Sequence, residues 1–507
     1  MRKKESAPTF KPYIQNQINL LPPSLESLVP PNHPVRVVNA VIDRLDLASF
    51  IASYAGGGRS SYHPVPLLKI LSYAYLRNIY SSRKIEEAVQ ESVHFMWLSG
   101  GNAPDHNTIA RFRSGTLKGK VRDIFSQIVQ LLAEEGQVTL KEAFVDGTKI
   151  EANANRYTFV WGKSIKRSKE RIAEQLKELL DYADKIAGDD SESIAPEFKA
   201  LDADKVRDTI AKINERIAEK EVDPKVRQKI GYAKKHWPQA LERYEKQEEI
   251  LGDRNSYSKT DEDATFMRTK DDHMGNGQLK PCYNLQISTE NQYITNYTVH
   301  QNPTDTRTLK PHVDAFEASH GNTPEALTAD AGYGSEENYE YLESKGVEAF
   351  VKFNKFHQEQ HKGIDEFDPD GWAHDTENDR FTCPAGVRLI KEDMRKDTVN
   401  GFEKEIHVYR SEGCGGCPFR ERCHKSPHDR KIEINHRLRV HKAKARERLK
   451  SERGVAHRKQ RCHEPETVFG DIKFNRKFTR YSLRGLQKVE AETALLAIAH
   501  NLKKLAA

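Results

Sequence analysis

Two aspartates occupy positions where the local sequence could hold a metal ion. Asp146 follows the apolar run 143–145 and Asp330 follows the run 326–329, and glycines come soon after both. An acid at the end of a strand is held rigidly, and a nearby glycine lets a substrate approach closely. Two such carboxylates on neighbouring strands could share divalent cations, because Mg²⁺ prefers oxygen ligands. An aspartate followed by glycine is also common turn chemistry, so both interpretations stay open at this point.

A third acid, Glu466, opens a helical stretch near the C-terminus. Glu466 and Lys473 are about two helical turns apart and so share a helix face. The carboxylate would complete a site for two Mg²⁺ ions about 4 Å apart, and the lysine could contact a phosphate. The alternative is a surface glutamate, which the helix dipole favours near a helix N-terminus.

Four of the six cysteines form a separate candidate site. They are Cys383, Cys414, Cys417 and Cys423, with His424 as a spare ligand. Zinc is the usual occupant of a four-cysteine site, and two of these thiols have the Cys-x₂-Cys spacing. The sequence therefore favours either a structural Zn²⁺ site or a set of unliganded reduced thiols.

The stretch 430–461 is strongly basic and contains Arg458 and Arg461. Such residues neutralise DNA phosphates and give salt-sensitive affinity. The alternative is a solvated helix with i,i+4 ion pairs such as Arg448 with Glu452. The excess of positive charge favours DNA contact.

Composition limits the class of protein. The chain has 507 residues, of which 31% are charged, and a formal net charge of +6. This length predicts two or three domains. No apolar run reaches the ~18 residues of a membrane helix, and the N-terminus has no apolar signal segment. We therefore expect a soluble cytoplasmic protein that does not contact a membrane.

Hydrophobic periodicity predicts the elements that must position these residues. Helices are expected over 15–135, and a charged helical insertion, in the form of a hairpin, over 165–250. Strands are expected at 283–288 and 293–299, with a turn at 289–292 between them. A helix (304–319), a strand (326–330), a helix (335–345) and a strand (347–352) follow. Residues 355–430 look irregular. This order suits a mixed sheet flanked by helices.

Several segments together resemble a known family. They are FVDGTKIEANAN, YNLQIS, LTADAGYGSEEN and ETVFGDIKFNRKFTRYSLRGLQKVEAE. These segments are similar to the DDE transposases of bacterial insertion sequences, and the similarity covers nearly the whole chain. The resemblance implies an α/β fold: a ribonuclease-H-like mixed sheet with a helical N-terminal domain and a long helical insertion.

The resemblance also assigns roles to residues. Asp146 matches the family's first Asp in Val-Asp-Gly-Thr, and Asp330 matches the second in Asp-x-Gly-Tyr. Glu466 and Lys473 keep the Glu-x₆-Lys spacing. The family's preceding Tyr and Arg positions do not match here, so Arg458 and Arg461 are the candidate substitutes and Glu464 is an alternative third ligand.

What the family does gives the expected partners. Its members bind Mg²⁺ through these acids, and cut and join double-stranded DNA at the ends of their own element. A homodimer on DNA is expected, because two ends must be brought together. The segment 105–113, with Arg111 and Arg113, resembles the family's end-binding region.

The expected domains follow from these assignments. A helical, DNA-end-binding domain covers 1–135, a catalytic core covers 136–164, 252–355 and 462–507, a charged helical insertion covers 165–251, and a Cys-containing insertion with a basic helix covers 356–461. Two alternatives remain open: a domesticated, inactive DNA-binding protein, and a ribonuclease-H-like nuclease without strand transfer.

Overall fold

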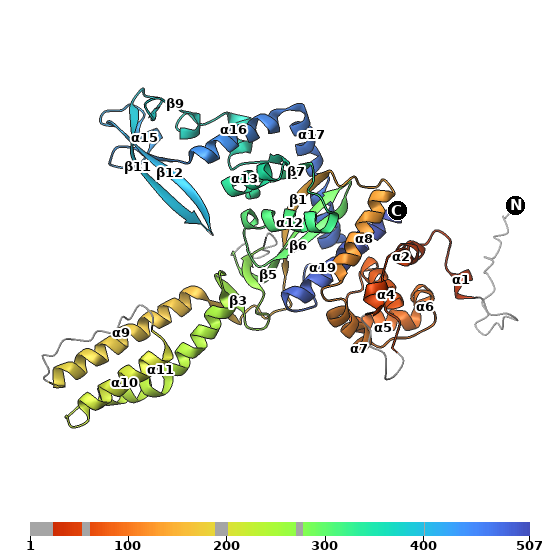
Figure 1. The fold of residues 1–507 in the computed structure, drawn as a ribbon, viewed down its shortest axis with the longest axis horizontal. Coiled ribbons are helices and arrows are strands. Elements are labelled where there is room, and N and C mark those ends of the chain that lie inside the picture. Colours follow the sequence, from red (N-terminus) through yellow and green to blue (C-terminus); the bar gives the residue numbers. More distant parts are fainter. Residues whose placement is uncertain (1–23, 53–60, 188–200, 270–276, 400) are drawn as a thin grey trace, which may run out of the picture.

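The computed structural model describes residues 24–52, 61–187, 201–269, 277–399 and 401–507. A central sheet carries a helical N-terminal region on one side (Figure 1). A long helical arm and a small β-domain project from the other side. Parts of the expected N-terminal domain and helical insertion, at 1–23, 53–60 and 188–200, lie outside the described residues.

The central sheet mixes antiparallel and parallel strands. Its strands are β1 (Glu142–Glu151), β4 (Thr265–Arg268), β5 (Leu279–Glu290), β6 (Tyr293–His300), β7 (Ala326–Ala329) and β8 (Glu348–Val351). The order is β4-β5-β1-β7-β8, and β6 also pairs with β5. The pairs among β6, β5 and β1 are antiparallel, whereas β1, β7 and β8 are parallel. Three antiparallel strands followed by two parallel ones match the expected ribonuclease-H-like fold class.

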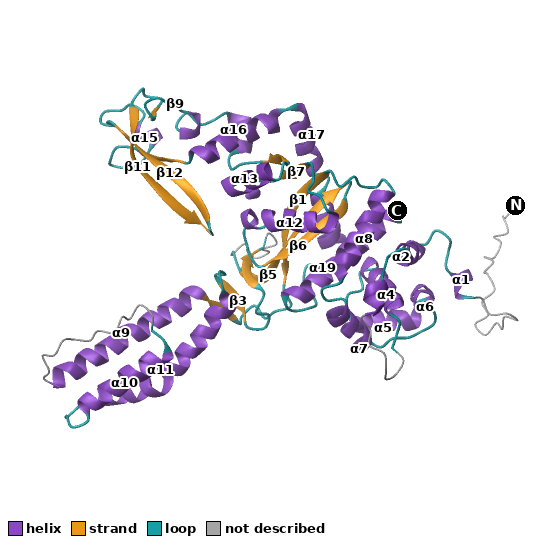
Figure 2. Cartoon of the chain, viewed as in Figure 1, coloured by secondary structure: helices purple, strands orange, loops and turns teal. Residues whose placement is uncertain are grey.

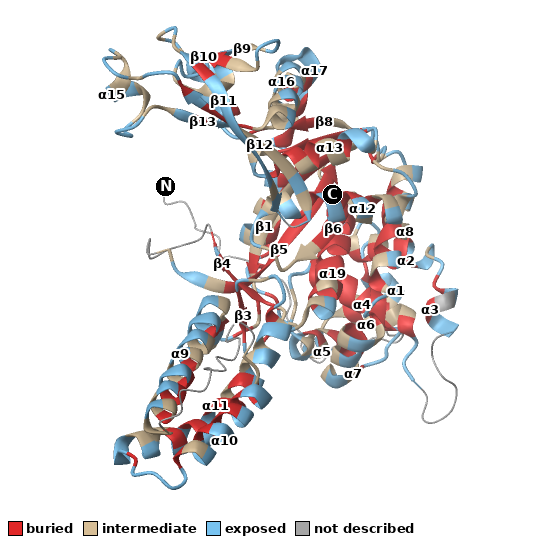
Figure 3. Cartoon of the chain, turned by 60° about the vertical axis from the view of Figure 1, so that its left-hand side comes forward, coloured by how far each residue is buried: buried red, intermediate tan, exposed pale blue. Residues whose placement is uncertain are grey.

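Alternation along β1 supplies the two cores on either side of the sheet. Ala143 and Val145 pack into a cluster with β7 and β8, whereas Ile150 packs with the N-terminal helices. Successive side chains of a strand point to opposite faces. Figure 3 shows buried residues concentrated in this sheet and the helices against it. These helices are α12 (Leu309–His320), α13 (Glu336–Ser344) and α19 (Leu486–Leu505).

The N-terminal region is helical, as expected. Its elements are α1 (Leu25–Leu28), α2 (Pro34–Asp43), α3 (Ala48–Ala52), α4 (Pro64–Leu76), α5 (Ser82–Glu91), α6 (Val93–Ser99), α7 (His106–Arg111), the π-helix η1 (Phe112–Thr116) and α8 (Val121–Glu134). The helices α4 and α8 pack against α19 in one shared core. The N-terminal region is therefore joined to the sheet by buried apolar contacts.

The charged insertion forms three helices in the described residues rather than a hairpin. They are α9 (Gly162–Ala187), α10 (Ala203–Ile217) and α11 (Pro224–Leu251). They bury their own apolar stripe, and the short pair β2 (Phe159–Trp161) and β3 (Ser256–Ser258) closes the base. The start of α10 is capped by Asp202, whose side chain accepts a hydrogen bond from Lys205 N.

The expectation that 355–430 is irregular is wrong. Figure 2 shows strands there, in a second, five-stranded antiparallel sheet. The strands are β9 (Ala373–Asp375), β10 (Arg380–Thr382), β11 (Arg388–Val399), β12 (Phe402–Ser411) and β13 (Lys431–Ile434). Most side chains of β11 are exposed and many are charged, so the sequence has no alternation of apolar and polar residues to reveal the strand.

The remaining elements are helices that join the β-domain to the central sheet or lie within one of these two parts. The long ones are α16 (His436–Lys450) and α17 (Glu452–Arg461), followed by α18 (Pro465–Gly470) and the π-helix η6 (Asp471–Asn475). The short ones are η3 (Asp305–Arg307), η4 (Ala331–Tyr333), α14 (Phe356–Lys362), η5 (Pro369–Gly371) and α15 (Arg420–Cys423). No helix in the described part of the chain could span a membrane.

Candidate active site

The register of two parallel strands brings Asp146 and Asp330 together. Phe144 of β1 is paired with Thr328 of β7. Asp146 and Asp330 each lie two residues further along, so they continue on the same face of neighbouring chain segments. The expectation that Asp146 ends a strand is wrong, because β1 continues to Glu151 through its pairing with β5. Asp330 does follow the end of β7.

Each aspartate uses one oxygen to accept a hydrogen bond from the backbone N–H of a following glycine. Asp146 Oδ1 accepts a hydrogen bond from Gly147 N at 2.8 Å. Asp330 Oδ1 accepts one from Gly332 N, also at 2.8 Å, and so caps η4. The second oxygen of each carboxylate, Oδ2, contacts the Arg461 guanidinium that lies between the two aspartates.

One guanidinium contacts all three predicted acids. Arg461 Nη2 lies 3.1 Å from Asp146 Oδ2 and 3.7 Å from Asp330 Oδ2. Arg461 Nη1 lies 3.4 Å from Glu466 Oε1. Because both aspartate oxygens contact the same Nη2 atom, the distance between them cannot exceed the sum of these two contacts. That distance is therefore below the ~8 Å limit for two carboxylates that share two metal ions. The end of α17 and the start of α18 therefore bring Arg461 and Glu466 to the strand acids.

Exposure rises across this carboxylate cluster, which we define as Asp146, Asp330 and Glu466. The Arg461 side chain is 7% exposed and that of Asp146 is 17% exposed. Asp330 is 41% exposed and Glu466 is 53% exposed. The cluster is therefore closed at the sheet and open to solvent at α18, as a site for a bulky substrate requires.

The donor set of the cluster fits a hard divalent cation. All three side chains are carboxylates, and a positive group, the Arg461 guanidinium, already lies among them. The carboxylate oxygens of these three residues do not all lie within 4.8 Å of one another. Among the described residues, one group of three possible metal ligands is that compact, and it lies in the β-domain. The Arg461 guanidinium separates the carboxylates at this distance.

A fourth acid, Asp305 on η3, lies beside the cluster and was missed by the sequence reasoning. Its Oδ1 accepts hydrogen bonds from Asn284 at 2.8 Å and from Gln286 at 3.1 Å. Lys149 Nζ lies 3.7 Å from the same oxygen. The only sequence signal was its position in a turn before a helix, which is common for aspartate.

Buried polar groups support the floor of the site. The Tyr333 hydroxyl donates a hydrogen bond to Gln286. Burial, followed by the charges of Asp146 and Asp305, raises the pKa of Tyr333 well above its usual value. A Cβ at Gly147 would overlap the Gln286 side chain, so this glycine is needed for close approach.

Glu464, the alternative third ligand, has a structural contact. It is only 4% exposed, and its Oε2 accepts a hydrogen bond from Gln292 N at 2.8 Å. Gln292 and Asn291 form a two-residue turn between β5 and β6, with φ of 60° and 51°. The turn is thus shorter than the expected 289–292. Glu464 anchors it, which leaves Glu466 as the acid directed toward Arg461.

The predicted DNA-binding residues lie in different surroundings. Lys473 is half-buried on η6, within electrostatic range of Cys282 on β5. Arg458 donates to Leu449 O at 3.1 Å and to Gln360 Oε1 at 3.0 Å, away from the cluster. Arg458 therefore ties α17 to α16 and α14.

The two N-terminal arginines also differ. Arg111 is exposed on α7. Arg113 is 4% exposed, and its guanidinium donates to the Tyr75 hydroxyl at 3.2 Å and to Tyr80 O at 2.5 Å. The structure thus presents Arg111 to solvent and places Arg113 inside the N-terminal helices.

The four cysteines and His424 line one small cavity of the β-domain. All four thiols are free and half-buried, and both ring nitrogens of His424 are buried without a hydrogen-bond partner. Among the described residues, no three of these ligand atoms lie within 4.8 Å of one another. Structural zinc here stays a prediction.

Much of the charge on the basic helices is neutralised by distant acids. The pairs are Arg437 with Glu336, Lys442 with Asp370, Lys444 with Glu343, Arg446 with Glu359, and Arg453 with Glu348. These partners come from α13, η5, α14 and β8. Counting the acids within the basic stretch itself could not reveal these partners. Because they neutralise many of its cations, the excess of positive charge is weaker support for DNA contact along the whole stretch.

Two family models match the chain. A transposase DDE domain matches residues 382–506, which include Arg461 and Glu466. A transposase domain (DUF772) matches residues 23–115. No match was found among curated proteins or solved structures. Asp146 and Asp330 lie outside both matched ranges.

These matches agree with the resemblance carried by the sequence motifs. They cover the helical N-terminal region and the segment that runs from the β-domain to the last helix. The sheet order between them is that of a ribonuclease-H-like domain. The two transposase-domain matches indicate an insertion-sequence DDE transposase family.

Proposed function

We propose that this transposase cleaves the ends of its insertion sequence and joins them to target DNA, with Asp146, Asp330 and Glu466 holding two Mg²⁺ ions. The observation that carries the proposal is the convergence of all three carboxylates on the Arg461 guanidinium. Three acids without a cation among them would repel one another strongly. Their arrangement is therefore one that a cation stabilises.

The residues of the chain position the reaction. Bound divalent ions would activate the attacking oxygen and stabilise the leaving one. Asp146 and Asp330 offer one outward oxygen each, because the other is held by a glycine N–H. Glu466, more exposed, completes the set from α18. Tyr333 and Gln286 keep the floor rigid.

Arg461 has two successive partners in this proposal. Without metal, it neutralises the carboxylates. With the carboxylates held by metal ions instead, its planar donors would suit a phosphate of bound DNA. The Nε of Arg461 is buried without a hydrogen-bond partner, so this side chain has an unused donor for such a contact.

DNA binding is proposed to use other cations as well. Lys473 and the exposed Arg111 are candidates for phosphate contacts, and so are Arg458 and Arg113 if their present contacts are released. A homodimer would hold two element ends together. Salt-sensitive binding would follow from such contacts.

Single substitutions of the two aspartates test the proposal. Asp146→Asn and Asp330→Asn are compared with wild type in cleavage of a duplex carrying the element's terminal repeat, with Mg²⁺ present. We expect cleavage to fall by several orders of magnitude, because a neutral amide is a poor Mg²⁺ ligand. A gel-shift assay of the same duplex should change little, because affinity comes mainly from Lys and Arg.

The matched control is Asp208→Asn, an exposed aspartate on the helical arm. Near-normal cleavage by either active-site variant would reject the proposed ligands. Binding without any cleavage by wild type would indicate a domesticated DNA-binding protein. Cleavage without joined products would indicate a nuclease that lacks strand transfer.

A further inference from the structure

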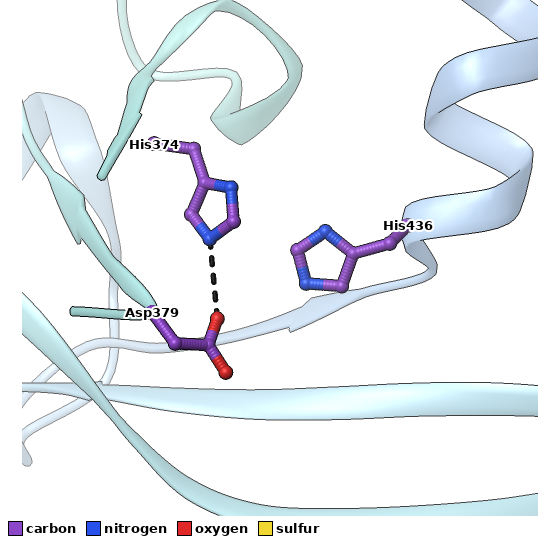
Figure 4. Close-up of side chains that lie close together, drawn as sticks. All are labelled: His374, Asp379 and His436. Atoms are coloured by element: carbon purple, nitrogen blue, oxygen red, sulfur yellow. Dashed lines mark hydrogen bonds and ion pairs between the residues drawn. The ribbon is translucent and has the colours of Figure 1, made fainter. Parts of the chain in front are cut away.

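Two imidazoles and one carboxylate gather in the β-domain. His374 lies on β9, Asp379 lies in the turn before β10, and His436 begins α16. One ligand atom from each lies within 4.8 Å of the other two, the only such group of three or more in the described residues. Figure 4 shows the three side chains, which come from separate elements, facing one another. The distance from His374 Nε2 to Asp379 Oδ1 is 3.2 Å.

We call His374, Asp379 and His436, together with their neighbours His407 and Tyr409, the histidine cluster. The His407 ring on β12 is 4.7 Å from the His436 ring, centroid to centroid. His407 Nδ1 is buried and has no hydrogen-bond partner. The Tyr409 hydroxyl lies 2.7 Å from Asp379 Oδ1 and 2.7 Å from His436 Nε2. The cluster therefore contains an unsatisfied buried nitrogen and a hydroxyl that orients two of its members.

The donor types of the cluster suit a cation. Neutral imidazole and ionised carboxylate are the forms that bind metal, and two imidazoles lie beside one carboxylate here.

We propose that His374, Asp379 and His436 bind a divalent transition metal ion, with Zn²⁺ as the expected occupant and His407 as a fourth ligand. Imidazole with carboxylate suits zinc, which takes four N or O ligands at about 2.0–2.2 Å. Movement of about 1 Å per side chain would bring the ligand atoms of His374, Asp379 and His436, which lie within 4.8 Å of one another, to tetrahedral spacing. The Tyr409 hydroxyl would not bind the metal itself but would orient the ligands through hydrogen bonds.

The position of this site gives it a structural role. His436 begins α16, and α17, which follows, ends at Arg461 beside the carboxylate cluster. A metal ion at the histidine cluster would fasten β9, β12 and the start of α16 to one another. It shares no ligand with the proposed Mg²⁺ site or with the four cysteines, so it does not depend on the proposed function.

Metal content tests the proposal on the full chain, purified without a histidine tag. Wild type is stripped with chelator, reloaded with Zn²⁺ and measured by mass spectrometry. We expect His374→Ala, Asp379→Asn and His436→Ala each to lose one zinc equivalent relative to wild type. Tyr409→Phe should retain zinc but bind it about 10-fold more weakly, as removal of an outer partner does.

The matched control is His236→Ala, an exposed histidine on the helical arm. Equal zinc content in this control and in the three ligand variants would overturn the proposal. Because an alanine variant could fail to fold, His436→Gln is measured too, with circular dichroism as the folding check. When wild type is loaded with Co²⁺, part of its absorption spectrum should come from Co²⁺ that has no thiolate ligand. A spectrum that contains only thiolate-bound Co²⁺ would also overturn the proposal.

Discussion

The carboxylate cluster and the histidine cluster hold charge in opposite ways. In the central sheet, three acids surround a buried guanidinium and open to solvent at Glu466. In the β-domain, one imidazole contacts the Asp379 carboxylate, and the Tyr409 hydroxyl links that carboxylate to the imidazole of His436. Carboxylates alone suit a hard cation that keeps water and phosphate as further ligands, whereas imidazole with carboxylate suits a borderline one. Two metal-type clusters in one chain therefore need not serve one reaction.

The largest expected effect comes from the double variant Asp146→Asn with Asp330→Asn. Each single change should already reduce cleavage by about 10³-fold or more, and the double change should cost little beyond that, because ligands of one site act as a unit. The measurement is the rate of strand cleavage at saturating Mg²⁺. Fully additive losses would show that the two acids act separately. The double variant should keep the zinc of the histidine cluster.

Glu466→Gln and Glu464→Gln should separate catalysis from stability. Glu466→Gln should reduce cleavage by orders of magnitude while stability changes by less than about 1 kcal/mol, since the Glu466–Arg461 pair is half exposed. Glu464→Gln should cost about 1–2 kcal/mol, because its buried carboxylate holds Gln292 N. Cleavage rate and urea unfolding are measured for both. The reverse pattern would make Glu464 the third ligand.

Arg461→Ala should destabilise the metal-free protein and make it respond to cations. Loss of the guanidinium leaves three facing carboxylates, at a cost on the order of 2 kcal/mol, less than for a fully buried charge because two acids are exposed. Added Mg²⁺ or Ca²⁺ should recover the melting temperature more than in wild type. The control is Arg458→Ala, whose side chain contacts Leu449 O instead. Equal recovery in both variants would argue against a shared cation position.

The smallest expected effect is the acid sensitivity of the histidine cluster. In the metal-free folded chain the pKa of His436 is lowered to about 4, first by burial, against about 6.5 when unfolded. Between these values the unfolded state binds the extra proton, so stability should fall as pH drops from about 6.5 to about 4.

His436→Gln should remove part of that slope in thermal unfolding curves. His236→Gln, on the exposed helical arm, should leave the slope unchanged. An unaltered slope in His436→Gln would mean that this imidazole is not kept neutral by folding.

Sequence reasoning succeeded where a feature depends on residue types that lie close together in the chain. The fold class followed from strands and helices whose apolar periodicity is strong, such as β5 to β8. The positions of Asp146 and Asp330 after buried residues pointed to neighbouring strands, although β1 runs past Asp146. The assignment of these acids as metal ligands remains a proposal.

Sequence reasoning failed where partners are distant. The charged strands β11 and β12 have few apolar residues, so their sheet was not expected. Asp305 looked like an ordinary turn residue. The acids that neutralise the basic helices lie far away in the sequence, from 72 residues for Lys442 with Asp370 to 105 for Arg453 with Glu348.

By itself the sequence determined the family, the mixed-sheet fold class and the acids that could bind metal, because these depend on residue type and short spacing. Only the tertiary structure decided that Arg461 lies among three carboxylates, that Glu464 anchors a turn, and that His374 and His436 meet. These facts depend on strand register and helix packing, which join residues far apart in the chain. No local pattern encodes that geometry.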